Sequence, residues 1–208
     1  MAKYNPEEED FNIWPTYSDI GFAIVLILVF IILAQYVVIG KIIQINEIEQ
    51  EQKRLTEKLQ ETFPREYGTA IQDVAEPQLQ KITFSDRILF DSGSDILRLE
   101  GRRILRGVAN ILNDLRSRRK FDEIQIRGHT DDIPINTARF PTNWELSSAR
   151  ATSVVRFFVD ECGLNPENGL LLSAQGYSEF DAIRANNSSS NRALNRRIEI
   201  VIKYPLPY

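Results

Sequence analysis

Residues 20–40 read IGFAIVLILVFIILAQYVVIG, and this apolar stretch decides the architecture of the 208-residue chain. Gln35 is its only strongly polar side chain. Twenty-one residues, at about 1.5 Å each, cover the roughly 30 Å hydrocarbon core of a bilayer, which predicts a membrane-spanning helix. A cleaved signal peptide starts with basic residues and ends at a small-residue cleavage site. Here residues 7–10 are acidic and no such site follows, so we expect an uncleaved anchor.

The anchor divides the chain into a short tail and a larger C-terminal part. The formal net charge of −4 is spread without a concentrated basic block, which argues against a nucleic-acid partner because phosphate binding needs clustered Lys and Arg. The single cysteine, Cys162, lies between apolar Val159 and Leu164, which is typical of a small buried side chain. The expected segments are a tail over residues 1–17, a membrane helix over 18–40, a heptad helix over 41–63, a connector over 64–79 and a compact domain over 80–204.

Helical character continues beyond the membrane segment, over residues 41–63. Ile45, Ile48, Leu55 and Leu59 follow one another at spacings of three, seven and four, which is a heptad seam of about two repeats. Such a seam predicts that two parallel copies of the chain pair here as a homodimer with a short coiled coil. A single amphipathic helix lying on another surface is the alternative, because two repeats are short for a coiled coil.

The C-terminal part has the pattern of a compact α+β domain. Apolar side chains at every second position predict strands, and apolar side chains at helical spacing predict helices. The sequence therefore predicts a small sandwich whose four-stranded sheet carries helices on one face. The expected strands lie at 82–84 continuing into 88–90, at 124–126, at 170–174 and at 198–202, the expected helices at 99–115 and 144–162, and the expected polar loop at 128–143.

Asp19 stands at the start of the apolar stretch. A carboxylate inside a membrane segment costs about 2.5–3.5 kcal/mol on insertion scales, so such a residue usually faces a partner or an ion path. Low dielectric also makes reversible protonation near neutral pH feasible for a carboxyl group. Asp19 is therefore a candidate ion carrier. A carboxylate that caps the membrane helix at headgroup level is the alternative.

A second candidate site lies around the polar loop. Asp131 follows a predicted strand, and Arg150 lies inside the predicted helix that comes after the loop. A strand–loop–helix unit can fold back and bring this anion and this cation into one pocket. The pair suits a zwitterion, whose carboxylate binds the guanidinium fork and whose ammonium binds the carboxylate. A plain Asp–Arg salt bridge is the alternative.

Several ordered motifs lie between residues 80 and 204. They are ILFDSGS at 88–94, GHTD at 128–131, NWELS at 143–147, RA at 150–151, GY at 176–177 and NRRIE at 195–199. Together they resemble the OmpA-like peptidoglycan-binding domain. The long loop and the run FPTNWELS look more like the MotB-type flagellar stator subunits than like outer-membrane members of the family.

The resemblance implies a ligand and a location. In the family, the Asp of the His-Thr-Asp motif and the Arg before the Ala hold the diaminopimelate of the peptidoglycan stem peptide, which maps onto Asp131 and Arg150. Thr130, Asn143 and Arg197 are implied as further pocket residues. The compact domain and the heptad helix would lie in the periplasm. The chain would cross the bacterial inner membrane once, with its tail in the cytoplasm.

The resemblance also implies an ion-driven motor. The family places an Asp at the start of its single membrane helix to carry the translocated ion, so Asp19 would pass protons or sodium ions. The partner would be a MotA-like multi-span membrane protein that forms a ring around a dimer of this chain, in a flagellar motor or a Zorya-type antiphage system. A passive wall tether without ion flow is the alternative function. We expect no enzyme activity, cofactor or metal site, since His129 is the only histidine and no nucleophile motif accompanies it.

Overall fold

A computed structural model describes residues 14–69, 71–76, 78–117, 121, 123–166 and 170–205 of the chain. The chain divides into two compact units, Met1–Gln44 and Ile45–Tyr208. The first helix, α1 (Trp14–Thr62), contributes residues to both units. The tail expected at residues 1–17 lies mostly outside the described residues, which begin at Trp14.

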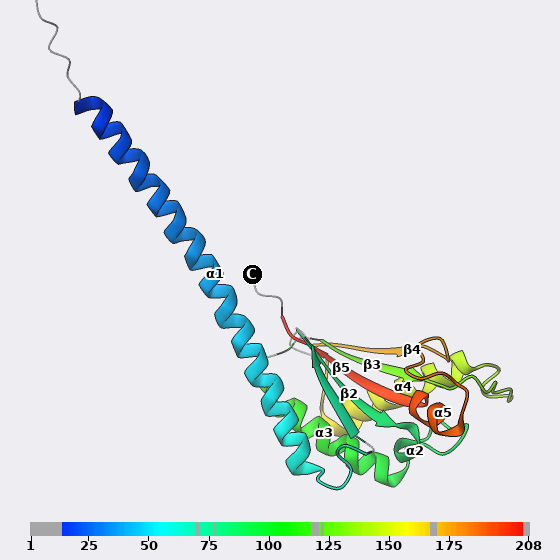
Figure 1. The fold of residues 1–208 in the computed structure, drawn as a ribbon. Coiled ribbons are helices and arrows are strands. Elements are labelled where there is room, and N and C mark those ends of the chain that lie inside the picture. Colours follow the sequence, from blue (N-terminus) through cyan, green and yellow to red (C-terminus); the bar gives the residue numbers. More distant parts are fainter. Residues whose placement is uncertain are drawn as a thin grey trace, which may run out of the picture. The chain divides into compact units, whose positions relative to one another are not determined.

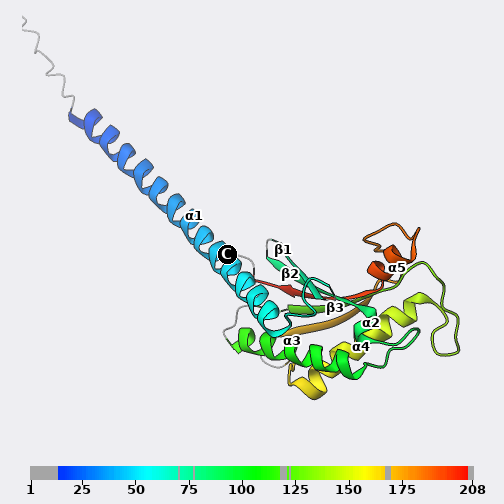
Figure 2. The ribbon, with the colours of Figure 1, turned by 60° about the horizontal axis from the view of Figure 1, so that its bottom comes forward.

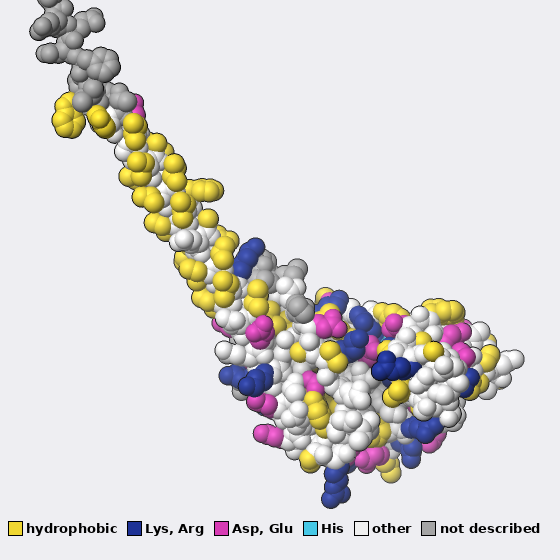
Figure 3. All heavy atoms as spheres, in the orientation of Figure 1, with side chains coloured by type: hydrophobic (Ala, Val, Ile, Leu, Met, Phe, Trp, Pro, Cys, Tyr) yellow, Lys and Arg dark blue, Asp and Glu magenta, His cyan; other side chains and the backbone are white. Residues whose placement is uncertain are grey.

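The described part of the N-terminal unit is the first part of α1. Its apolar side chains all face outward, and none of its most hydrophobic 18-residue window is buried. Figure 3 shows hydrophobic side chains along most of this part of the helix, on the face in view. By length and composition, α1 can therefore cross a membrane, as the apolar stretch at residues 18–40 predicts.

The C-terminal unit is an α+β sandwich built on a five-stranded sheet. The strands are β1 (Ile71–Glu76), β2 (Leu79–Ser85), β3 (Glu123–His129), β4 (Leu171–Gly176) and β5 (Arg197–Lys203), and the remaining helices are α2 (Asp86–Leu89), α3 (Leu99–Ser117), α4 (Asn143–Cys162) and α5 (Ser189–Asn195). The strand order is β1-β2-β5-β3-β4, with only β3 and β4 parallel. Figures 1 and 2 show α3 and α4 on the same face of the sheet, so the predicted fold class is confirmed.

The core of this unit lies between the sheet and its helices. On β5, Ile198, Ile200 and Ile202 occupy every second position and are completely buried. α3 adds a buried face at helical spacing that includes Ile104 and Val108. Because α4 connects the parallel strands β3 and β4, the polar loop between β3 and α4 lies at the edge where both strands end.

Two glycines allow α4 to approach that edge closely. A Cβ on Gly128 of β3 would lie 2.2 Å from the carbonyl oxygen of Ser147. A Cβ on Gly176 of β4 would lie 2.2 Å from Oγ of Ser148. Both distances are far inside van der Waals contact, so a larger residue at either position would push the first turns of α4 off the sheet.

Two elements differ from the expectation. β1 lies inside the segment 64–79, so the sheet has five strands and that segment is more than a connector. β1 is an edge strand in which only Ile71 is buried, and it therefore lacks the alternation that marks a strand in a sequence. Ile88 lies in the short helix α2 instead of a strand, because two apolar residues at a spacing of two do not distinguish a strand from a single helical turn.

The last turns of α1 pack into the core of the C-terminal unit. Leu55 and Leu59 are 0% exposed, and Phe63 follows them into the core. A side chain in the core of its own chain is unavailable to a second copy, so the homodimer seam expected through Leu55 and Leu59 is corrected to packing within one chain. Ile45 stays exposed and Ile48 is partly buried. The arrangement is that of the amphipathic-helix alternative.

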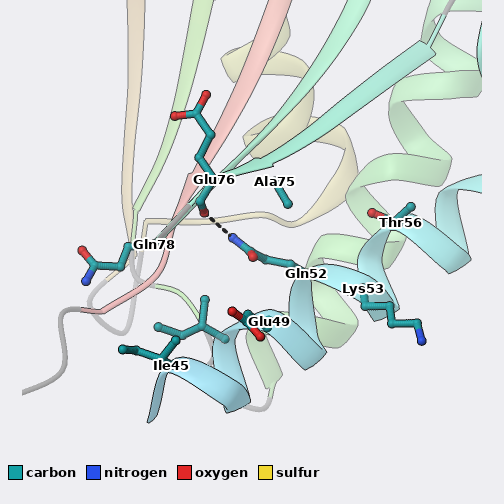
Figure 4. A pocket seen from close by; sticks show the side chains of 9 residues that line it. Ile45, Glu49, Gln52, Lys53, Thr56, Ala75, Glu76 and Gln78 are labelled. Atoms are coloured by element: carbon teal, nitrogen blue, oxygen red, sulfur yellow. Dashed lines mark hydrogen bonds between the residues drawn. The ribbon is translucent and has the colours of Figure 1, made fainter. Parts of the chain in front are cut away.

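Gln52, which interrupts the apolar heptad positions, fastens α1 to the first hairpin of the sheet. Its Nε2 donates hydrogen bonds to the carbonyl oxygens of Glu76 (2.8 Å) and Leu79 (3.0 Å). Figure 4 shows the Gln52 amide reaching from α1 to the end of β1. A cavity of about 640 Å³ lies beside this contact, and Ile45 and Lys53 are among its lining residues.

Candidate functional site

A cavity of about 530 Å³ lies where α2, the loop after β3 and the start of α4 meet. Thr130 and Asp131 come directly after β3, Asn143 is the first residue of α4, and Arg150 follows two turns later. All four residues line the cavity, which we call the charged pocket. The strand–loop–helix unit thus brings Asp131 and Arg150 into one pocket, as their positions in the sequence predict.

Arg150 is held at the base of the charged pocket with only 2% of its surface exposed. Its guanidinium donates to the carbonyl oxygens of Ser94 (Nε, 2.9 Å) and Asp91 (Nη2, 3.2 Å) and to Oδ2 of Asp86 (Nη1, 3.3 Å). It also lies 5.2 Å from the ring centroid of Phe90. A guanidinium has five N–H groups, so two remain for a ligand once these three bonds are made. Burial lowers the pKa of Arg150, and the charge of Asp86 opposes that shift.

Asp86 is a pocket residue that the sequence did not reveal. Its Oδ2 lies 3.6 Å from Nε of Arg196 as well as 3.3 Å from Arg150. Its Oδ1 is buried and has no hydrogen-bond partner among the described residues. Burial raises the pKa of the Asp86 carboxyl against the effect of both arginines. A buried acceptor without a donor is costly unless a ligand or water supplies one.

Asp131 is paired with Arg196 and forms no salt bridge with Arg150 in the described part of the chain. Oδ2 of Asp131 accepts a hydrogen bond from Nη1 of Arg196, and Oδ1 accepts one from the backbone N–H of Ile133 (3.2 Å). Asp131, Arg196, Asp86 and Arg150 therefore form a row of alternating charges. The simple Asp–Arg salt bridge considered as an alternative is replaced by this four-membered cluster.

Arg197, predicted as a pocket residue, lies outside the charged pocket, and its neighbour Arg196 takes that place. Arg197 is 2% exposed and donates to Oε1 of Glu199 at 2.7 Å, with Asp181 at 3.3 Å. Successive residues entering a strand point to opposite faces, so a difference of one position moves the side chain to the other side of the sheet. The motif contains two arginines in succession, and the sequence alone did not distinguish them.

Asn143 and Thr130 shape the charged pocket through the backbone. Nδ2 of Asn143 donates to the carbonyl oxygens of Asp131 (3.2 Å) and Ile133 (3.1 Å), and its Oδ1 accepts from the N–H of Ile135 (3.3 Å). The N–H of Thr130 donates to the carbonyl of Ser178 at 2.9 Å. These bonds fix the loop that carries Asp131.

The start of α4 is fixed by a capping box. Thr142 accepts a hydrogen bond from the backbone N–H of Trp144, and the Glu145 carboxylate accepts one from the N–H of Thr142 at 2.8 Å. The motif Thr-Asn-Trp-Glu therefore sets where α4 begins, and with it the positions of Asn143 and Arg150.

His129 packs against the opposite face of the sheet from the core. It is 1% exposed, its ring stacks on Tyr177 with centroids 5.0 Å apart, and its Nε2 lies 3.7 Å from Oε2 of Glu199. Burial lowers the pKa of His129. Burial alone would raise the pKa of Glu199, but His129 and Arg197 lower it to about 2. His129 is the last residue of β3.

Asp19 lies in the N-terminal unit, near the start of α1. It is exposed, and among the described residues no hydrogen bond or ion pair engages its carboxylate. The described chain therefore supplies neither a cap contact nor an ion path for Asp19.

The sequence of this chain is similar to a known protein family and to several known proteins. A family model described as the OmpA family matches residues 89–196. Motility protein B of Bacillus subtilis (strain 168) is 34% identical over 123 residues, which cover 58% of this chain and 44% of that protein. The uncharacterized protein YtxE of the same organism is 33% identical over 122 residues, 59% of this chain and 47% of that protein. The chain spans about half the length of these curated relatives.

Solved structures resemble the fold as well. A putative MotB-like protein from Desulfovibrio vulgaris has a TM-score of 0.67 and 28% identity, covering 79% of this chain and 96% of that chain. The cell wall anchor of the T6SS from Pseudomonas aeruginosa has a TM-score of 0.60 and 27% identity, covering 71% and 96% of the two chains.

Proposed function

The chain belongs to the OmpA family, and on that premise we propose that it is the peptidoglycan-anchored subunit of an ion-driven stator in a bacterial inner membrane. The C-terminal unit holds the wall in the periplasm, and α1 crosses the membrane with the N-terminus in the cytoplasm. The observation that carries this proposal is the charged pocket, where Asp131 and Arg150 lie at the positions that the family motifs assign to wall binding.

The ligand of the charged pocket is a zwitterionic diaminopimelate side chain of a stem peptide. Two N–H groups of the Arg150 guanidinium are left over from its contacts with the protein, and they bind the ligand carboxylate. The ligand ammonium binds Asp131 and Oδ1 of Asp86, which lacks a donor. Two carboxylates and two guanidiniums already balance in the cluster, so a ligand with both charges adds no net charge to a buried site.

The motor part of the proposal is supported by the relatives called Motility protein B and by the apolar first part of α1. Asp19 carries a proton or a sodium ion, and a MotA-like multi-span protein forms the ring that completes its path. Two copies of this chain share the ring. Since Leu55 and Leu59 are in the core, the copies meet through residues that remain accessible on α1, including Ile45.

The wall-binding part is tested by sedimentation of the full chain, solubilised in detergent, with purified sacculi. Asp131→Ala and Arg150→Ala should each weaken binding about tenfold or more, because charge-assisted hydrogen bonds of roughly 1.5–3 kcal/mol are lost. Asp132→Asn is the matched control, since Asp132 pairs with Arg192 outside the pocket lining. Unchanged sedimentation of both pocket variants would disprove the wall site.

A passive tether between membrane and wall is the second candidate. It is suggested by the solved cell wall anchor of the T6SS from Pseudomonas aeruginosa, which this chain resembles with a TM-score of 0.60 and 27% identity. Asp19→Asn separates the two functions, because Asn keeps the size of Asp but removes titration. In the motor, ion entry into cells that express the complete complex should disappear while wall binding stays intact. If the chain is a passive tether, Asp19→Asn should leave its function unchanged.

A further inference from the structure

A second cavity, of about 340 Å³, adjoins the charged pocket and differs from it in chemistry. Pro134, Ile135 and Asn143 line both cavities, so the two lie next to each other. One wall of the second cavity is an aromatic pair. The rings of Trp144 and Phe180 stack with centroids 5.5 Å apart and an angle of 28° between their planes. We call this cavity the aromatic cleft.

The aromatic pair is exposed although it is ordered. Trp144 is 48% exposed and Phe180 is 71% exposed, and neither belongs to the hydrophobic core. Within the described residues no hydrogen bond engages the indole N–H of Trp144. Ordered aromatic rings at a surface, with an unused donor, are typical of a binding surface and add little to folding stability.

Polar groups surround the aromatic rings of the cleft. The Glu179 carboxylate lies on one side and accepts a hydrogen bond from Nδ2 of Asn143 at 3.3 Å. The exposed Asn136 amide and the Thr142 side chain also line the cleft. An apolar face bordered by amide and carboxylate groups matches a pyranose ring, which has apolar C–H faces and polar hydroxyl and acetamido edges.

We propose that the aromatic cleft binds an N-acetylated hexosamine ring of the glycan strand whose stem peptide occupies the charged pocket. The inference rests on the proposed wall-binding function and extends it from the peptide to the sugar. In peptidoglycan the stem peptide is covalently attached to the glycan, and the two cavities share a wall. One ligand molecule therefore fills both, and the second contact is favoured by the high effective concentration that the first contact creates.

The test compares two soluble probes on the full chain in detergent micelles. One probe is the diaminopimelate-containing stem tripeptide alone, and the other is the same tripeptide attached to the N-acetylglucosaminyl-N-acetylmuramic acid disaccharide. Each Kd is measured by calorimetry. A Trp14→Phe background leaves Trp144 as the only indole, since the chain has two tryptophans, so the fluorescence of Trp144 reports on the cleft directly.

The parent should bind the disaccharide probe about tenfold more tightly than the tripeptide, and only the disaccharide probe should change the Trp144 fluorescence. Trp144→Ala and Phe180→Ala should remove this advantage and leave the tripeptide Kd unchanged. Leu171→Ala, which removes an exposed apolar side chain outside both cavities, should change neither Kd.

Three results would overturn the proposal. Equal affinity of the parent for both probes would show that the sugar makes no contact. An equal loss for both probes in the aromatic variants would show that the rings support the charged pocket only. If neither probe binds at all, the wall-binding function fails together with the inference, whereas tripeptide binding that depends on Asp131 would preserve the former.

Discussion

The two units of this chain place apolar side chains in opposite environments, even along the same helix. In the N-terminal unit the apolar residues of α1 are all exposed, whereas Leu55 and Leu59 near its end are completely buried in the C-terminal unit. The C-terminal unit also buries charge, at Asp86, Arg150 and Glu199. The described apolar side chains of the first unit are not covered by the chain itself, so length and composition are enough to predict its helix. The second unit depends on contacts between distant residues, which only the fold reveals.

The largest expected effect separates the two environments on α1. Leu59→Asp should prevent folding of the C-terminal unit, because an unpaired carboxylate in the core costs a large part of the roughly 5–15 kcal/mol by which domains are stable. Ile45→Asp, at a position 44% exposed, should leave folding intact. Circular dichroism and urea unfolding of residues 45–208 measure both. If the Leu59→Asp variant folds, Leu59 does not lie in the core and is again a candidate for the seam between two copies.

The next effect compares the two arginines that flank the start of β5. Arg197→Ala should destabilise the C-terminal unit by about 3–5 kcal/mol, because the buried Glu199 loses its nearest cation. Arg196→Ala should instead lower affinity for sacculi, because Arg196 holds Asp131 and Asp86 in the charged pocket. Urea midpoints and sedimentation with sacculi are measured for both. Similar profiles for the two variants would contradict the separation of the two sheet faces.

Asp86→Asn probes the carboxylate that the sequence did not reveal. Asn preserves shape but removes the charge that the ligand ammonium would meet, so sacculus binding should weaken about tenfold, or roughly 1.4 kcal/mol. Asp132→Asn, at a carboxylate that pairs with Arg192 outside the lining of both cavities, serves as a control for the loss of a carboxylate near the site. Binding of the Asp86→Asn variant at the parent level would remove Asp86 from the ligand contacts.

The smallest effect is a pH dependence that belongs to the C-terminal unit. Burial places the pKa of His129 in the folded chain below its ordinary value of 6.5. Below about pH 6.5 the unfolded chain therefore binds a proton that the folded chain does not, and stability decreases as the pH is lowered. Glu199 has a folded pKa of about 2 against an ordinary 4.5, so its contribution is lost as the pH falls from 4.5 toward 2. The urea midpoint of the parent should decrease from pH 7 to pH 5, and this decrease should be absent in His129→Gln. A slope that survives would assign it to another group.

Much of the fold could be predicted because its signals are local. The apolar stretch of α1 needs only length and composition, and α4 begins at a capping box that is legible as Thr-Asn-Trp-Glu. The alternating isoleucines of β5 mark a central strand. Asp131 and Arg150 could be assigned to one pocket because the strand–loop–helix order leaves few other arrangements.

The remaining features depend on tertiary contacts. The spacing of Leu55 and Leu59 suits a dimer seam and an intrachain core equally well, since both bury one face of a helix. The choice between Arg196 and Arg197 depends on a register of one residue, which the NRR motif does not fix. Asp86 was hidden because its short helix has too few residues to show a period.

Gly128 and Gly176 have a consequence for how this site can diversify. They let α4 lie against the ends of β3 and β4 with no room for even one added methyl group. In a saturation library selected for folding, both positions should tolerate no replacement, while residues 132–139 of the exposed loop should accept many. The sequence at the rear of the charged pocket is therefore tightly constrained, whereas the sequence of the loop at its front can vary. Selection can therefore change what the front recognises without having to rebuild the scaffold behind it.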